Sequence, residues 1–214
     1  MLRLVDMQRE GMTIGLMLPE GYWSVEASWG QSRLRVYEPA QAEVQALASL
    51  LAAFYNDSHN AAMLTNTRRF ASDDVVQWYE GSRAKGDRPF FLEQDGELIG
   101  DADFRNIEGS EAEFAILIGR RSQQNRGLGT GCAALMHVAA LRVFRFARVY
   151  ATVIPNNLPS RRVLEKLGYR PDPSPRARAL AETEDELAMS LDLAEFEQTH
   201  AELLQQAVIA RRGP

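Results

Sequence analysis

The sequence contains one cysteine, Cys132, and this excludes an internal disulfide framework. Its three histidines, His59, His137 and His200, lie too far apart along the chain to indicate a metal site. No apolar run is long enough for a membrane span, and no signal-peptide pattern is visible at the start. These absences predict a cytoplasmic protein with no bound metal and no membrane partner.

Basic residues are also in the minority. The 214-residue chain has 24 Lys and Arg against 29 Asp and Glu, which gives a formal net charge of −5. A surface that binds nucleic acid through its phosphates needs an excess of positive charge, so no nucleic-acid partner is expected. The 45% of hydrophobic and 25% of charged residues are typical of a globular domain that buries a sizeable core.

The spacing of apolar residues predicts an α/β protein with a mixed sheet. Period-two alternation or β-rich composition predicts strands at 33–39, 88–94, 97–104, 111–119, 147–154, 176–182 and 186–193. Helical spacing predicts helices at 40–57, 72–86, 128–146, 157–169 and 194–212. Asp95-Gly96 is a preferred two-residue hairpin turn between the second and third strands.

The last predicted helix is amphipathic. Its apolar stripe comprises Leu193, Phe196, His200, Leu203, Ala207 and Ala210. Such a stripe must be covered, either by its own domain or by a second copy of the chain. We expect a homodimer.

Three glycines at alternate positions, Gly127, Gly129 and Gly131, stand where a strand gives way to a helix. Glycine offers nothing to pack and weakens regular structure, so a core does not need this pattern. Free N–H groups at the start of a helix bind anions, and small residues let a phosphate approach them. The segment 124–129 therefore predicts a phosphate-binding turn. The alternative is a glycine-rich helix start without a ligand.

Two familiar phosphate-binding designs do not fit. A Walker A loop needs Lys followed by Ser or Thr directly after its final glycine, whereas Cys132 follows Gly131. A dinucleotide-binding fingerprint needs glycine or alanine at position 132, and a tighter strand-to-helix turn. A third pattern, Q/R-x-x-G-x-G/A, is present as Gln124-Asn125-Arg126-Gly127-Leu128-Gly129.

This third pattern is that of the GNAT family of acetyl-CoA-dependent N-acetyltransferases. "AEFAILIGRRSQQNRGLGTGCA" resembles the family's fourth strand, loop and third helix, and "NLPSRRVLEKLGY" resembles the second motif of its ribosomal-protein N-terminal acetyltransferase (Rim-type) branch. The resemblance implies a GNAT fold with a mostly antiparallel central sheet, flanking helices and splayed strands. It divides the chain into an extension (1–32), the GNAT domain (33–193), and a C-terminal helix and tail (194–214).

The resemblance implies transfer of an acetyl group from acetyl-CoA to a primary amine by direct attack. The acceptor could be a protein N-terminus or a small cationic amine such as an aminoglycoside or polyamine. The alternative is a non-catalytic acyl-CoA-binding module. The residues that the resemblance assigns to CoA are Leu117, Ile118 and Gly119 beside the pantetheine, Asn157 opposite, and Gln124, Asn125, Arg126, Gly127, Leu128, Gly129 and Thr130 around the pyrophosphate.

Glu113 matches the glutamate that the Rim-type branch is proposed to use as general base. Alternation places it on one strand face with Ala115 and Leu117. The opposing interpretation is a carboxylate in a salt bridge, and Asp101 and Asp103 are reserve candidates for the base.

The leaving thiolate has no obvious acid. Leu164 occupies the position where many GNAT enzymes carry a tyrosine, so the resemblance leaves Ser160 as a hydrogen-bond donor, unless it only caps a helix. The acidic run Glu182–Glu186 falls where this family builds one wall of its acceptor site, although a solvated turn explains it equally. A negative rim would favour a cationic amine.

Overall fold

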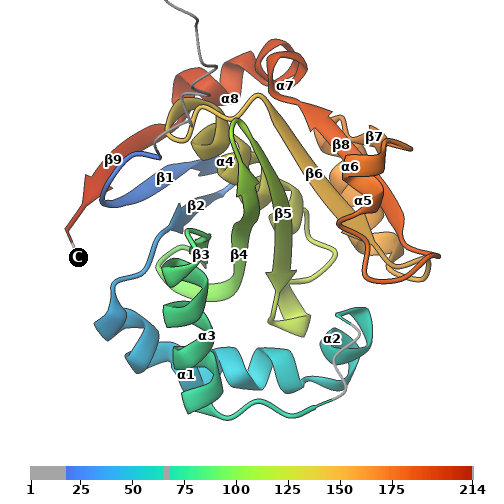
Figure 1. Ribbon diagram of the computed structural model, residues 1–214. Helices are drawn as coiled ribbons and strands as arrows, with labels where there is room; N and C mark the ends of the chain where they lie inside the picture. Colours follow the sequence, from blue (N-terminus) through green and yellow to red (C-terminus); the bar gives the residue numbers. More distant parts are fainter. Residues whose placement is uncertain (1–17, 65–67, 214) are drawn as a thin grey trace, which may run out of the picture.

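The computed structural model describes residues 18–64 and 68–213, and these form one nine-stranded sheet (Figure 1). Its strand order is β7-β8-β6-β5-β4-β3-β2-β1-β9, and all neighbours are antiparallel except the parallel pair β5 and β6. The strands are β1 (Tyr22–Trp29), β2 (Ser32–Tyr37), β3 (Arg88–Gln94), β4 (Glu97–Glu108), β5 (Glu111–Ile118), β6 (Arg148–Val153), β7 (Arg170–Pro171), β8 (Leu187–Asp192) and β9 (Val208–Arg212).

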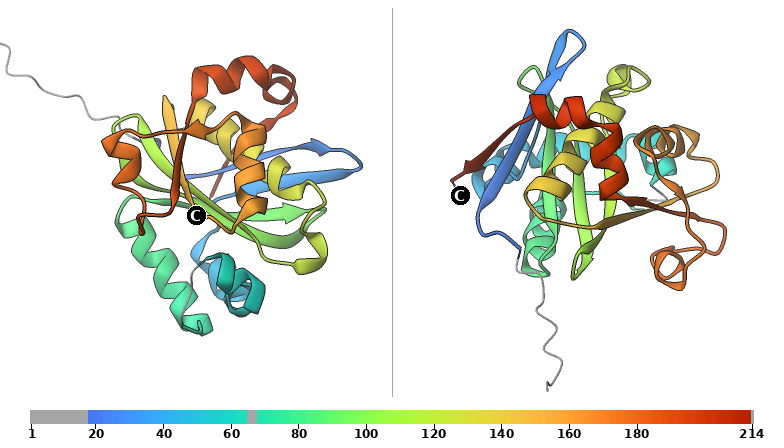
Figure 2. Two further views of the ribbon diagram at one scale, coloured as in Figure 1. Left: turned by 90° about the vertical axis from the view of Figure 1, so that its right-hand side faces the viewer. Right: turned by 90° about the horizontal axis from the view of Figure 1, so that it is seen from above.

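Helices cover both faces of this sheet (Figure 2). One face carries α1 (Gln41–Asn56), α2 (Ser58–Met63) and α3 (Ser72–Ala84). The other face carries α4 (Leu128–Arg142), with α5 (Leu158–Leu167), α7 (Leu193–Thr199) and α8 (Ala201–Gln206) around it; the short α6 (Pro175–Arg178) lies beside β6 and β8. This arrangement confirms the expected mostly antiparallel sheet flanked by helices.

The central elements form for the reasons that their sequences indicate. In α1, Val44, Leu51 and Phe54 recur at helical spacing and are buried in the core. The β3–β4 hairpin turns at Asp95 and Gly96, whose φ angles of 53° and 85° are the positive values that its turn requires. The Asp95 carboxylate also accepts a hydrogen bond of 2.8 Å from the N–H of Arg33, which ties the turn to β2.

His137 lies at the centre of the core, on α4, among Phe104, Phe114, Tyr169 and Phe196. Its Nδ1–H donates to the carbonyl of Ala133 at 2.7 Å, so its Nε2 accepts from the Tyr169 hydroxyl, also at 2.7 Å. Burial lowers the pKa of His137 to about 4. His137 therefore packs in the core and also links α4 to the segment after α5 by a hydrogen bond.

The predicted strand over 176–182 is wrong, because its first residues form α6 instead. Pro175 occupies a first-turn position, and the Ser174 hydroxyl caps the helix by accepting from the N–H of Ala177 at 3.2 Å. At the start of α3, Ala71 takes the N-cap position, and its N–H donates to the Asp74 carboxylate at 2.7 Å.

The predicted single helix over 194–212 is wrong as well. The chain forms α7 and α8 with a break at His200, and residues 208–212 then form β9. Residues 208–212 form a strand rather than a helix because β1 offers an open edge. Strand β9 pairs along this edge from Tyr22↔Arg212 to Glu26↔Val208. Strand β1 itself lies within the expected N-terminal extension, of which residues 1–17 fall outside the described part of the chain.

This rearrangement changes what covers the apolar stripe of the C-terminal segment. Leu193 and Phe196 are fully buried in the core of the same chain, and Leu203, Leu204 and Ala207 pack against that core. Because its own domain covers the stripe, the stripe gives no support for a homodimer.

We predict that His137 makes the stability of the protein depend on pH. An unfolded histidine titrates near 6.5, whereas folded His137 binds a proton only near pH 4. The titration of this histidine therefore leaves the free energy of unfolding unaffected above pH 6.5. This free energy decreases as the pH falls towards 4, by on the order of 3 kcal/mol, because the unfolded chain binds the proton first. Urea unfolding of wild type and His137→Gln at pH 7.5 and pH 4.5 measures this. Equal pH dependence in both proteins would contradict the prediction.

Candidate active site

Strands β5 and β6 pair over only three residue pairs and then diverge (Figure 1). The pairs run from Glu111↔Arg148 to Glu113↔Tyr150. Beyond them, β5 stays paired with β4 as far as Ile118↔Gly100, and β6 stays paired with β8. A cavity of about 400 Å³ opens between the two strands, lined by residues 114–117 of β5 and 151–154 at the end of β6. The expected splayed strands are thus present.

The loop after β5 is held to that strand by the side chain of Gln124. Its Nε2 donates to the carbonyl of Ile118 at 2.7 Å and to Oδ1 of Asn60 at 2.9 Å. Asn60, on α2, in turn donates to the carbonyl of Gly119 at 2.9 Å. The N–H of Gly119 is also hydrogen-bonded, because it donates to the carbonyl of Ile99 at 2.8 Å. Gln124 and Asn60 therefore fix where the loop stands relative to the cavity.

The three glycines differ in backbone conformation and in what surrounds them. Gly127 precedes α4 with a φ of 81°, a left-handed conformation that suits glycine. A Cβ at Gly129 would lie 3.5 Å from Ile118 and 3.6 Å from Val163, which is ordinary contact. A Cβ at Gly131 would lie 2.5 Å from Leu34 and 2.8 Å from Trp29, so this glycine lets α4 approach β1 and β2. Only the first two belong to the phosphate-binding prediction.

The start of α4 offers unused hydrogen-bond donors. Within the described residues, no side chain or carbonyl accepts from the N–H groups of Leu128, Gly129 and Thr130. Asn125 has a positive φ of 59° and is exposed, as is Arg126. Three free amides at the positive end of a helix, beside an exposed arginine, form a site that can bind an anion.

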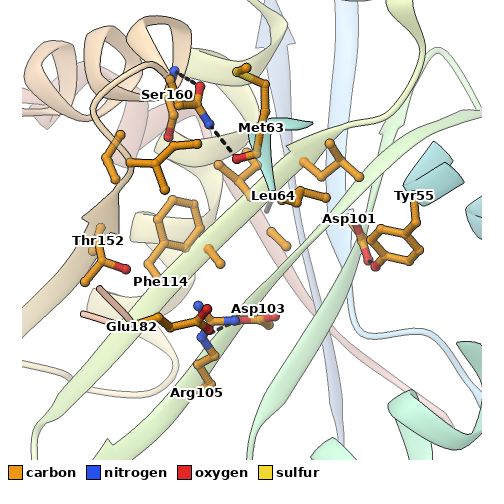
Figure 3. A pocket seen from close by; sticks show the side chains of 18 of the residues that line it. Tyr55, Met63, Leu64, Asp101, Asp103, Arg105, Phe114, Thr152, Ser160 and Glu182 are labelled. Atoms are coloured by element: carbon orange, nitrogen blue, oxygen red, sulfur yellow. Dashed lines mark hydrogen bonds and ion pairs between the residues drawn. The ribbon is translucent and has the colours of Figure 1, made fainter. Parts of the chain in front are cut away.

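Asn157 and Ser160 both line the cavity, and Ser160 is labelled in Figure 3. Asn157 caps α5, because its Oδ1 accepts from the N–H of Ser160 at 3.1 Å, and its Nδ2 donates to the carbonyl of Met63 at 3.2 Å. It thereby links α5 to α2 across the opening. Leu164 is buried in the cavity wall one turn further along α5. It offers no proton donor there.

Two buried carboxylates of β4, Asp101 and Asp103, face the cavity. Asp101 accepts hydrogen bonds from the hydroxyls of Tyr55 and Tyr79, the latter at 3.1 Å. Asp103 is 6% exposed and its Oδ1 has no hydrogen-bond partner; the nearest cation, Nε of Arg105, is 3.9 Å away. Burial raises the pKa of Asp103 to about 7, although Arg105 opposes the shift. Burial likewise raises the pKa of Asp101 to about 6.

Glu113 lies opposite Arg105 in the β4–β5 register and is 2% exposed. Its Oε1 accepts from the Arg105 guanidinium at 2.9 Å, and its Oε2 accepts from Asn106 at 2.6 Å. It lines a neighbouring cavity of about 480 Å³ and does not line the cavity between β5 and β6. Both of its oxygens are engaged, whereas Asp103 has one oxygen free.

The remaining walls of the cavity come from segments that carry no recognisable motif. Tyr55, Phe70 and Trp78 line it from the helical layer of α1 to α3, and Glu182 and Glu186 line it from the segment before β8. Figure 3 shows Asp103, Arg105 and Glu182 gathered on one side of the cavity, with Ser160 on another. Sequence reasoning missed the aromatic residues, because nothing near them in the chain indicates that α1 and α3 reach the site.

The described residues contain no group of three or more His, Cys, Asp and Glu side chains that could hold a metal ion. No helix among them has the length and apolar character needed to cross a bilayer. Cys132 is fully buried, and burial raises the pKa of its thiol to about 12, as suits a small core side chain.

The sequence model of the GNAT acetyltransferase domain matches residues 33–170. This match covers more than half of the chain, so the protein belongs to the GNAT acetyltransferase family. The expected family and the acyltransferase class of enzyme are thereby confirmed.

Solved structures agree on the fold. Mycobacterium smegmatis RimJ in complex with CoA-disulfide matches with a TM-score of 0.66 and 19% identity, over 86% of this chain and 95% of that chain. Aminoglycoside acetyltransferase AAC(6')-Ib in complex with coenzyme A matches with a TM-score of 0.63 and 20% identity, over 73% and 95%. A chimera of spermidine N-acetyltransferase SpeG from Vibrio cholerae and hSSAT matches with a TM-score of 0.61 and 15% identity, over 76% and 97%. No curated protein sequence matches the chain significantly.

We predict that Gly131→Ala lowers the free energy of unfolding by about 1 to 2 kcal/mol, because the added methyl group displaces Leu34 and Trp29. Gly129→Ala is the matched control. Its methyl group meets only ordinary contacts, and alanine favours the helix by up to about 1 kcal/mol. Urea unfolding of both variants checks the prediction, which is wrong if Gly131→Ala is as stable as Gly129→Ala.

Proposed function

We propose that this enzyme transfers the acetyl group of acetyl-CoA to a cationic primary amine. The free amides of Leu128, Gly129 and Thr130, with the loop from Gln124 to Gly127, fit the pyrophosphate of the donor. The opening between β5 and β6 fits its pantetheine arm. Because Gln124 and Asn60 already occupy the carbonyls of Ile118 and Gly119, the edge available to that arm is β5 up to Leu117, facing Asn157.

The free Oδ1 of Asp103 is the observation that carries the catalytic part of this proposal. Asp103 lines the cavity and its Oδ1 has no hydrogen-bond partner, so its carboxylate can accept a proton from the attacking amine. Its raised pKa brings it close to the operating range of a general base. An ammonium nitrogen has no lone pair, so the acceptor first gives one proton to Asp103. The neutral nitrogen then bonds to the thioester carbonyl carbon, the C–S bond breaks, and the second proton passes to the departing thiolate, which leaves as the thiol. Thiol release from acetyl-CoA, measured over a library of amines, tests the activity itself.

The leaving thiolate needs little assistance, since a thiol with a pKa of about 8.5 is a tolerable leaving group near neutral pH. Ser160 is the rim residue proposed to donate a hydrogen bond to the sulfur, given that Leu164 cannot. Glu113, the base indicated by the Rim-type resemblance, is proposed instead to hold Arg105 in place through its 2.9 Å contact. Arg105 then lies beside Asp103 as a fixed positive charge.

Asp103→Asn is predicted to lower kcat by about 10² to 10⁴-fold, and Glu113→Gln by much less. For wild type, kcat/KM should fall as the pH drops through about 7, because Asp103 must be ionised to act as the base. In Asp103→Asn, kcat/KM should not show this fall below pH 7. Rate profiles from pH 6 to 9 measure both effects. Loss of activity in Glu113→Gln with retention in Asp103→Asn would reverse the assignment.

The acceptor side of the cavity is acidic. Glu182 and Glu186 line it, while Glu184 and Asp185 of the same run are exposed and outside its lining. With Asp101 and Asp103 deeper in the cavity, these carboxylates attract a positively charged acceptor. Two of the structural neighbours are named for acting on aminoglycosides and spermidine, which are cationic amines, and this supports the same class of acceptor here.

We predict that Glu182→Gln/Glu186→Gln raises KM for the best amine about threefold to tenfold at low salt. The increase should shrink at high salt, where surface charges are screened. Glu184→Gln/Asp185→Asn removes the same charge outside the cavity and should leave KM nearly unchanged. Equal changes in both double variants would show that the carboxylates act only through net charge.

A further inference from the structure

Trp78 is a large apolar side chain that the fold leaves in contact with solvent. The core-facing side of α3 is formed by Val75, Tyr79 and Ser82, which are buried, whereas Trp78 is 40% exposed. Among the described residues, three large hydrophobic side chains are exposed, and of these Trp78 alone lines the cavity between β5 and β6. An aromatic side chain that lines a cavity and keeps part of its ring exposed can contact a bound ligand.

The surroundings of Trp78 hold the indole in place. Val75 and Trp78 are three residues apart on α3, so they share one flank of the helix, and both line the cavity. The indole contacts Tyr79 in a T-shaped arrangement with ring centroids 5.0 Å apart. The Tyr79 hydroxyl donates to buried Asp101, so the ring that supports Trp78 is itself anchored to the cavity floor. Phe70 and Tyr55 extend the aromatic wall.

The cavity therefore combines an aromatic wall from α1 to α3 with carboxylates from β4 and the segment before β8. The carboxylates can bind an ammonium group. The aromatic wall suits an apolar partner that carries a ring, because a ring presents a compact face to the indole and aromatic pairs gain energy beyond the area that they bury. A short unbranched amine uses the first feature without the second.

We propose that Trp78 determines acceptor specificity by stacking against a ring, so that the preferred acceptor is a cationic amine carried on a ring. The proposal rests on the acetyltransferase function proposed above and narrows its substrate class. Trp78 acts on binding and orientation of the acceptor, and it takes no part in proton transfer.

The test compares benzylamine and cyclohexylmethylamine with heptylamine, which has the same number of carbon atoms and one amine. Each amine is compared with itself between wild type, Trp78→Phe and Trp78→Leu, so that differences in basicity cancel. In Trp78→Leu, kcat/KM for the ring-bearing amines should fall about fivefold to tenfold more than for heptylamine. Trp78→Phe keeps a flat ring and should retain most of the preference. Val208→Ala, an exposed apolar residue on β9 outside the cavity lining, is the control and should change nothing.

Two outcomes overturn the proposal: an equal loss for ring-bearing and linear amines, or an equal effect of Trp78→Phe and Trp78→Leu. Asp103→Asn separates this failure from failure of the proposed function, since it should abolish turnover of every amine while leaving the ring preference in binding. Calorimetry of benzylamine and heptylamine binding measures that preference without turnover. If wild type binds the two equally, Trp78 does not select a ring, whatever the activity proves to be.

Discussion

The divergence of β5 from β6 is the constraint on which the rest of the site depends. Strand β5 follows β4 to its end, and β6 follows β8, so the two cannot remain paired with each other beyond Glu113↔Tyr150. Backbone groups at such an opening need other partners. The loop and α4 follow β5 directly in the chain, and α5 follows β6. Both sequence motifs therefore lie at the same opening: one directly follows β5 in the chain, and the other directly follows β6.

Burial of charge is a second constraint, and it concerns the carboxylates on β4 and β5. Ionised carboxylates are costly to bury unless they are paired or hydrogen-bonded. Two tyrosine hydroxyls satisfy Asp101, and Arg105 with Asn106 satisfies Glu113. Asp103 lies between them on the same sheet face and keeps one oxygen without a partner. This difference from its neighbours is why Asp103 is the residue that we propose as the base.

Much of the catalytic domain could be predicted from short-range sequence signals. The loop at Gly127 and the cap at Asn157 depend on local backbone chemistry, and the β3–β4 turn depends on Asp95-Gly96. The errors arose where a distant element decided the outcome. Residues 208–212 have helical spacing, yet β1 offered them an open edge. Glu113 matches a motif, and its role as the base stays a prediction. Whether its oxygens are free depends on the β4–β5 register, which places Arg105 and Asn106 beside it. Trp78 reaches the cavity through the packing of α3, which no local pattern encodes.

The pairing of β9 with β1 has a consequence for biosynthesis. Residues near position 25 find their sheet partners near position 209, so this edge closes only after the segment out to Arg212 has been made. Contacts between residues so far apart in sequence form slowly, because a long loop must close first. Until then β1 presents unpaired N–H and C=O groups that another chain could pair with. The nascent protein therefore passes through a period in which its sheet has an unprotected edge.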